Sequence, residues 1–315
     1  MTPSPFSSIT HCRFPTGKPY GTFRFRAVID WIELRIVTAQ PSNHDTVTRR
    51  TGVPYAKAVN PGPGGAATEF LVRIHDPQSW DAVDEMLQRF TFDHPLVEPV
   101  TVNAIEIALD AYSRTGNRDD LTTLTYGFYK FATRLVSENK RFSKGKKSST
   151  LSLASDMLRP AHLAEGYNIY IGHSHDGVKQ HIYLKETTYQ DGKVVMLPEE
   201  ARRARTEVTF TGETVPRREF LDWRGFEFTA LASYFKFRRL KTTLKPIVRI
   251  GLEHIDQVGE RRTRRRRCGG TREYSVATIA DKELNALAYS ALRELTKRME
   301  RREGKPEDIG SISFH

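Results

Sequence analysis

In six separate segments of the chain, apolar side chains alternate with polar or small ones from one residue to the next. Successive side chains of a strand point to opposite faces of a sheet, so this alternation predicts strands with one buried face. Aromatic and β-branched residues, which favour strands, are frequent in the same segments. The six predicted strands cover residues 23–37, 68–74, 100–112, 167–172, 180–185 and 205–210.

Amphipathic stretches with helical spacing separate some of the predicted strands. One stretch runs from the capping residue Ser79 to about Phe90, and a second covers residues 117–137. Strands at hairpin distance, with helices between other pairs, are typical of an antiparallel sheet covered by helices. The sequence therefore predicts an α+β fold in which helices pack on one face of an antiparallel sheet.

Three regions are expected along the chain. Residues 1–20 are rich in Pro, Ser and Thr and are expected to be a flexible lead-in. Residues 21–215 hold all the predicted strands and form the expected main domain. Residues 216–315 are expected to form a helical, basic accessory region, with helices at 217–236 and 282–303.

The composition argues against several classes of protein. The 315 residues include no apolar run near the ~20 residues of a membrane span, and the first residues lack the pattern of a secretory signal. The cysteines, Cys12 and Cys268, are far apart, which argues against a disulfide scaffold and a cysteine zinc site. We therefore expect no membrane partner and a reducing, cytoplasmic location.

The chain carries a formal net charge of +11, and basic residues gather in clusters at 140–147, 260–267 and 297–302. Such an excess favours a polyanionic partner, most commonly nucleic acid, and predicts strongly salt-dependent binding. The alternative is that each cluster is a solvated loop or helix end. The residues expected to contact DNA are the one at position 143 together with Lys146, Lys147, Arg205, Arg264, Arg265, Arg266 and Arg267.

Reactive side chains gather on one face of the fifth predicted strand, where His181, Tyr183 and Lys185 alternate with apolar residues. A tyrosine flanked by a base and a cation is a plausible nucleophile, because the cation can stabilise a phenolate and the charge on an attacked phosphate. The sixth strand places Arg205 and Glu207 on one face, and pairing of the two strands would bring all five side chains together. This set suits metal-assisted phosphoryl transfer to tyrosine. The alternative is the solvated face of a half-buried antiparallel sheet.

Further carboxylates lie in the first and third predicted strands. Glu106 and Asp110 share a face with Ala104 and Ala108, and small residues beside carboxylates leave room for a ligand or a metal. Asp30 lies between apolar neighbours, and a buried carboxylate without a partner is costly. This favours a functional or paired role for Asp30.

Other residues have competing interpretations. His173 and His175 could bind a metal, but the glycine and aspartate that follow them indicate a turn. Tyr126 and Tyr129 could supply a second nucleophile, although their helical spacing among phenylalanines is typical of a core. Tyr189 lies just beyond the strand of Tyr183 and is an alternative nucleophile.

Five short motifs follow one another in a fixed order. They are Ile29-Asp-Trp31, the strand from Ala104 to Asp110, Tyr170-Ile-Gly172, Ile182-Tyr-Leu-Lys185 and Arg205-Thr-Glu207. In this order they resemble the motifs of the rolling-circle replication initiators of filamentous phages and related plasmids, over residues 25–215. The family's third strand usually reads Arg-Ile-Asp with a second acidic residue after it. Here Ala104 stands in place of the arginine and Glu106 in place of the first aspartate.

The resemblance implies a DNA strand transferase, with an initiator-like nuclease fold as the catalytic, origin-nicking domain at residues 21–215. Tyr183 would attack one backbone phosphate at a replication origin and form a 5′-phosphotyrosyl link. The free 3′-hydroxyl would serve a host polymerase, with a host helicase as a further partner, and would later attack the link to rejoin the strand.

The resemblance also implies Mg²⁺ or Mn²⁺, which oxygen ligands suit. Glu106 and Glu207 would be ligands, with Asp110 or His181 as further candidates, while Lys185 would stabilise the phenolate or the pentacoordinate phosphate. Two rival functions stay open. One is a non-catalytic DNA-binding protein, such as a repressor or an architectural factor, and the other is a single-strand or RNA-binding module with exposed aromatics.

Overall fold

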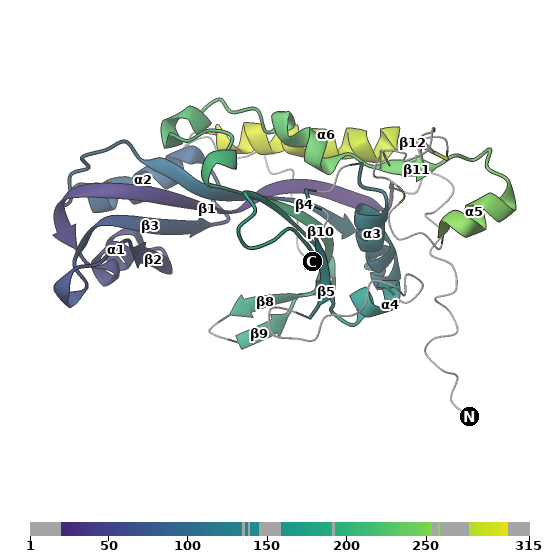
Figure 1. Cartoon of the computed structure of the whole chain (residues 1–315), viewed down its shortest axis with the longest axis horizontal. Helices are drawn as coiled ribbons and strands as arrows, with labels where there is room; N and C mark the ends of the chain where they lie inside the picture. Colours follow the sequence, from purple (N-terminus) through teal and green to yellow (C-terminus); the bar gives the residue numbers. More distant parts are fainter. Residues whose placement is uncertain are drawn as a thin grey trace, which may run out of the picture. The chain divides into compact units, whose positions relative to one another are not determined.

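The computed structural model describes residues 20–133, 136–137, 139–144, 159–190, 193–253, 258 and 277–301. Their fold is α+β and is built on a large antiparallel sheet, as the alternation predicts (Figure 1). Within this part of the chain, the sheet has the strand order β2-β3-β1-β4-β10-β7-β6-β5, and β8-β9 and β11-β12 form separate two-stranded sheets.

All six predicted strands are present among the strands of the structure. The strands are β1 (Phe23–Ser42), β2 (Tyr55–Ala58), β3 (Ala67–His75), β4 (Thr101–Ser113), β5 (Lys140–Ser143), β6 (Asn168–Ile171), β7 (Val178–Lys185), β8 (Thr187–Gln190), β9 (Lys193–Met196), β10 (Arg203–Thr211), β11 (Arg238–Leu240) and β12 (Thr278–Ala280). The α-helices are α1 (His44–Thr51), α2 (Trp80–Thr91), α3 (Arg118–Lys130), α4 (Arg159–Ala164), α5 (Pro246–Glu253) and α6 (Lys282–Met299). No helix among the residues described is both long enough and apolar enough to span a lipid bilayer.

The chain divides into two compact units, each built from separate stretches of sequence. The first unit holds Met1–Val28, Ala108–Thr209 and Thr229–Leu292, and the second holds Ile29–Ile107, Phe210–Phe228 and Arg293–His315. The functional boundaries expected after residues 20 and 215 stay a prediction.

In the second unit, one face of the sheet is a hydrophobic core. Phe70, Val72 and Ile74 of β3 alternate with more exposed residues and are at most 4% exposed. Helix α2 covers them with its apolar stripe, and the ring of Phe90 packs edge-on against Phe70 at 6.4 Å between centroids. Helix α1 lies beside β2, as Figure 1 shows. The opposite face of these strands carries polar and aromatic side chains.

Helix α2 begins at the predicted residue. The Ser79 hydroxyl accepts a hydrogen bond from the backbone N–H of Ala82 at 3.1 Å, which satisfies a donor that the helix leaves unpaired. We expect Ser79→Ala to lower the free energy of unfolding by about 1 kcal/mol, whereas Ser79→Thr should stay within a few tenths. Urea denaturation measures both, and an alanine variant as stable as the wild type would show that the cap contributes nothing.

In the first unit, helices α3 and α4 lie side by side (Figure 1), and α3 also contacts β7. Asn117 caps α3 through its side-chain oxygen, which accepts from the backbone N–H groups of Asp119 and Asp120. The buried stripe of α3 includes Leu121, Leu124 and Phe128. The helix therefore supports the strand that carries Tyr183.

Two predicted helices differ from the structure. The predicted helix at 117–137 ends at Lys130, because the chain at Ala132 pairs with Phe237 instead of continuing the helix. The stretch predicted as a helix at 217–236 forms two 3₁₀ segments, Phe220–Trp223 and Phe228–Phe235.

The reason for the second difference is non-local packing. Gly225 has a φ of 74°, which no continuous right-handed helix allows. Trp223 and Phe228 instead surround Trp80, with ring centroids at 6.0 and 6.4 Å. By contrast, the helix predicted at 282–303 is confirmed as α6, which runs to Met299.

Candidate active site

Strands β7 and β10 are neighbours in the sheet, and side chains from both meet on one face. The hydroxyl of Tyr183 donates a hydrogen bond to Oε1 of Glu207 at 2.7 Å. Nδ1 of His181 lies 3.2 Å from Oε2 of the same carboxylate. One carboxylate therefore orients both Tyr183 and His181, which the sequence predicts to share a face of the strand now seen as β7.

Glu207 is anionic although it is only 3% exposed. Burial alone would raise the pKa of its carboxyl group. The hydrogen bond and charge of His181, the charge of Arg205 and the hydrogen bond from Tyr183 outweigh burial and lower this pKa to about 2. The oxygen that faces Tyr183 is therefore a negatively charged acceptor throughout the neutral pH range.

Arg205 is the buried cation of the site, at 2% exposure. Its Nε and Nη2 donate to the two oxygens of Asp110 at 2.5 and 2.7 Å, and its Nη1 donates to Oε1 of Glu207 at 3.1 Å. Burial would lower the pKa of the guanidinium, but the charge and hydrogen bonds of Asp110 raise it well above its ordinary value. Arg205 thus holds the oxygen that also accepts from Tyr183.

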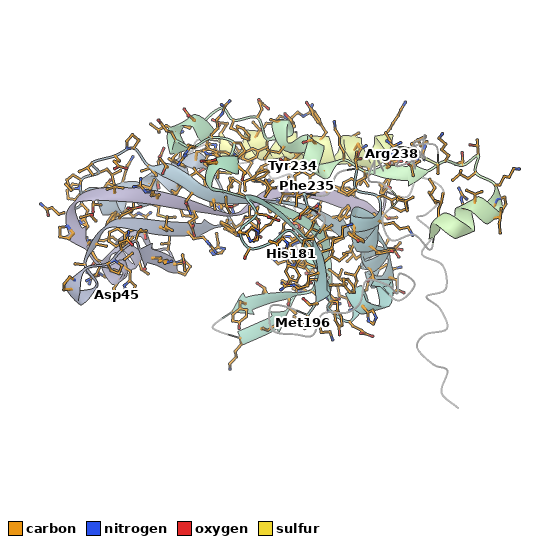
Figure 2. The ribbon with its side chains drawn as sticks, viewed as in Figure 1. Asp45, His181, Met196, Tyr234, Phe235 and Arg238 are labelled. Atoms are coloured by element: carbon orange, nitrogen blue, oxygen red, sulfur yellow. The ribbon has the colours of Figure 1, made fainter. Side chains whose placement is uncertain are left out.

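Stacked rings fix the orientation of Tyr183. The rings of Tyr170 and His181 stack with centroids 4.4 Å apart, and those of His181 and Tyr183 stack at 4.2 Å. The guanidinium of Arg141 lies over Tyr170 at 4.6 Å. Figure 2 labels His181 on its strand. Its Nε2 is buried and makes no hydrogen bond within the described part of the chain, so a ligand could satisfy it.

Three carboxylates from neighbouring strands could hold a metal ion. Asp30 of β1, Glu106 of β4 and Glu207 of β10 each offer one oxygen, and these oxygens lie within 4.8 Å of one another. Trp31 donates from Nε1 to Oε1 of Glu106 at 2.7 Å, which orients that carboxylate. Such oxygen donors suit a hard divalent cation.

The structure thus brings Glu106 and Glu207 together, as the resemblance implies, and adds Asp30 to them. Asp110 uses both oxygens on Arg205 and is outside this triad, and His181 is also outside it. Lys185 is half-buried at the end of β7.

Sequence reasoning missed Arg203. It shares a face of β10 with Arg205 and forms an ion pair with Asp110 at 3.2 Å. The signal was present in the sequence, because a residue two positions before Arg205 in a strand points to the same side. Tyr170 was noted only as part of a motif, although its ring packs on His181.

The expected DNA contacts stay a prediction, and the structure describes only some of these positions. Position 143 is a serine, and Ser143 is fully buried in β5, so it adds no positive charge. Its neighbour Lys144 lies over the ring of Tyr167 at 5.0 Å. Four arginines and two lysines that the sequence singles out lie outside the described residues. They are Lys146, Lys147, Arg264, Arg265, Arg266 and Arg267.

The alternative site residues are placed elsewhere. His173 and His175 lie in an exposed turn, where Asp176 accepts from the backbone N–H of His173 at 2.7 Å. Tyr126 and Tyr129 are buried, at 4% and 1% exposure, as their spacing predicts. Tyr189 is 74% exposed on the β8-β9 hairpin.

No protein-family model matches this chain, and no curated protein matches it. Among solved structures, a similar chain is the rolling circle replication initiator protein from Geobacillus stearothermophilus. It is 13% identical, with a TM-score of 0.34, and the match covers 74% of this chain and 99% of that chain.

Proposed function

We propose that this protein is a rolling-circle DNA replication initiator. It is a metal-dependent strand transferase and site-specific endonuclease that nicks one strand at an origin of a phage or plasmid. Tyr183 is the nucleophile. The observation that carries this proposal is the 2.7 Å hydrogen bond from Tyr183 to the anionic Glu207, whose carboxylate also contacts Arg205 and His181.

The proposed step transfers a DNA strand to the tyrosine. The phenolic oxygen of Tyr183 bonds to the phosphorus, its proton leaves through Glu207 to solvent, and the bond from phosphorus to the 3′ oxygen breaks. The 3′ oxygen takes a proton from water and becomes the free 3′-hydroxyl. The reverse attack of that hydroxyl rejoins the strand, so the phosphodiester energy is conserved in the 5′-phosphotyrosyl link.

The surrounding residues stabilise the charges of this step. The fixed cation of Arg205 interacts favourably with a Tyr183 phenolate. Lys185 follows Tyr183 by two residues on β7 and would stabilise the charge on the phosphate. A Mg²⁺ or Mn²⁺ ion held by Asp30, Glu106 and Glu207 would supply Lewis-acid neutralisation of that phosphate.

Burial of the charges favours this proposal over a solvated sheet face and over a non-catalytic DNA-binding protein. Glu207 and Arg205 are 3% and 2% exposed, and removing such charges from water costs several kcal/mol per ion. A surface that only attracts DNA needs exposed cations and gains nothing from this buried network. In the proposal the reaction takes place in the cytoplasm of a bacterial host, where a polymerase extends the 3′-hydroxyl and a helicase separates the strands.

A cleavage assay tests the proposal. The full-length protein is mixed with supercoiled DNA that carries its own gene and flanks, with Mg²⁺, with Mn²⁺ or with EDTA. We expect nicked circles only with metal, protein attached to the 5′ end, and a nucleotide-modified peptide that contains Tyr183. The matched control is Tyr189→Phe, which should nick normally. Tight binding without any nicking, or an adduct on another residue, would overturn the proposal.

A substitution of Glu106 tests the carboxylate triad. We expect Glu106→Gln to raise the metal concentration for half-maximal nicking by at least about tenfold, because an amide binds divalent cations more weakly than a carboxylate. Titration of Mn²⁺ measures the shift. The control is Glu85→Gln at an exposed position of α2, which should leave the titration unchanged. An unshifted curve for Glu106→Gln would remove this residue from the metal site.

A further inference from the structure

An arginine lies between two aromatic rings on the polar face of the second unit's sheet. The guanidinium carbon of Arg73 lies 4.1 Å from the ring centroid of Trp31 and 5.1 Å from that of Tyr55. The register places Tyr55 of β2 opposite Arg73 of β3, and Arg73 opposite Glu33 of β1. The group therefore crosses three neighbouring strands, which Figure 1 shows as β1, β3 and β2.

Partly buried hydrogen bonds hold this group in place. Nε and Nη2 of Arg73 donate to Oε2 of Glu33 at 3.2 and 2.7 Å, and Asn103 donates to the other oxygen of Glu33 at 2.6 Å. Glu33 is only 5% exposed. Trp31 is fixed separately by its hydrogen bond to Glu106. The rings and the guanidinium are thus oriented before any ligand arrives.

The same group is open to solvent, unlike the core face of these strands. Tyr55 is 40% exposed and the side chain of Arg73 is 32% exposed. Lys57 and His75, on the same face, are also exposed. A ring that served only the core would be buried, as Phe70 of β3 is at 0%. The open rings and cations are typical of surfaces that bind unpaired nucleic acid.

We propose that Trp31, Tyr55 and Arg73 form a stacking subsite for an unpaired base of the DNA strand. Every base offers a π face that stacks on an aromatic ring. The nearby cations, in a protein with a formal net charge of +11, complement the negative phosphate backbone of DNA. Trp31 also contacts Glu106, one of the three carboxylates that could hold the metal, so the subsite adjoins the metal ligands. The inference rests on the proposed function. It adds that this surface binds an unpaired base of the DNA strand.

Tryptophan fluorescence gives a direct readout, because the other tryptophans are inaccessible. Trp80 and Trp223 are 1% and 0% exposed, whereas Trp31 is partly exposed. The experiment uses full-length Tyr183→Phe protein in EDTA, so that neither cleavage nor metal contributes. The probes are single-stranded oligothymidylate, the same length of duplex DNA, and oligouridylate.

We expect oligothymidylate to quench the emission, and Trp31→Phe to abolish this quenching. Tyr55→Ala should weaken oligothymidylate binding roughly 5- to 100-fold while duplex binding stays within twofold. Arg73→Lys, which keeps the charge but loses the planar group, should also weaken it. Tyr289→Ala, at an exposed position of α6, is the matched control and should bind normally.

Unchanged oligothymidylate affinity in both Tyr55→Ala and Arg73→Lys would overturn the subsite. An equal loss of duplex affinity would also overturn it, since the surface would then be a general phosphate contact. Tighter binding of oligouridylate than of oligothymidylate would assign the surface to RNA and overturn the DNA subsite. Because nicking is assayed separately with Tyr183 intact, loss of the subsite and loss of the proposed activity give different results.

Discussion

Tyr183→Phe should abolish nicking, with a rate at least about 10⁴-fold below that of the wild type, because the proposed mechanism takes its attacking oxygen from Tyr183. Phenylalanine keeps the ring that stacks on His181 at 4.2 Å and removes only the hydroxyl and its hydrogen bond to Glu207. The fold and the affinity for DNA should therefore be retained. The measurement is the rate of nicking of supercoiled DNA, together with the yield of the covalent adduct and the dissociation constant for the same DNA.

Tyr189 supplies the control for this result. It is also a tyrosine, it lies six residues further along the chain, and it is 74% exposed on the hairpin that follows β7. Tyr189→Phe should leave the rate and the adduct unchanged. If Tyr183→Phe still nicks and Tyr189→Phe does not, the nucleophile is Tyr189 and the hydrogen bond to Glu207 has another role.

The strands of this fold could be predicted from the sequence because alternation is a local property. Spacing alone predicts that His181 and Tyr183 share a face of one strand. It also predicts that Arg205 and Glu207 share a face of a second strand. Whether these two strands lie side by side is a long-range feature that no local pattern predicts. The sequence indicated only that the side chains would meet if the strands paired. The structure has β10 beside β7, and this brings the 2.7 Å contact of Tyr183 with Glu207.

The triad shows where alternation stops being informative. Asp30 and Trp31 are consecutive, so a regular strand would point them to opposite faces. In the structure Trp31 donates to Glu106, and Asp30 lies with Glu106 in the carboxylate triad. No local sequence pattern predicts that Asp30 and Trp31 both lie near Glu106, because this depends on how β1 lies against β4. Likewise, the 3₁₀ segments near Trp223 follow from contacts with Trp80, which is distant in sequence.

Asp110→Ala should cost about 3–5 kcal/mol in the free energy of unfolding, because a buried cation loses the carboxylate that accepts two of its hydrogen bonds. Arg205 is 2% exposed and makes two of its hydrogen bonds to Asp110, which is itself 0% exposed. Arg203 would lose the same partner. Urea denaturation measures the loss, and Asp222→Ala, at an exposed position, should change stability by less than about 0.5 kcal/mol. A loss below about 1 kcal/mol would mean that water or another carboxylate compensates Arg205.

The milder variant Asp110→Asn separates two roles for this carboxylate. If Asp110 acts through Arg205, the variant should nick more slowly while the Mn²⁺ concentration for half-maximal activity stays unchanged. If Asp110 were a metal ligand, that concentration should rise about tenfold or more, as expected for Glu106→Gln. The geometry favours the first outcome, because both oxygens of Asp110 contact Arg205 at 2.5 and 2.7 Å. Arg205 in turn holds the Glu207 oxygen that accepts from Tyr183, so a less constrained Arg205 should misalign Tyr183 more than it changes the affinity for Mn²⁺.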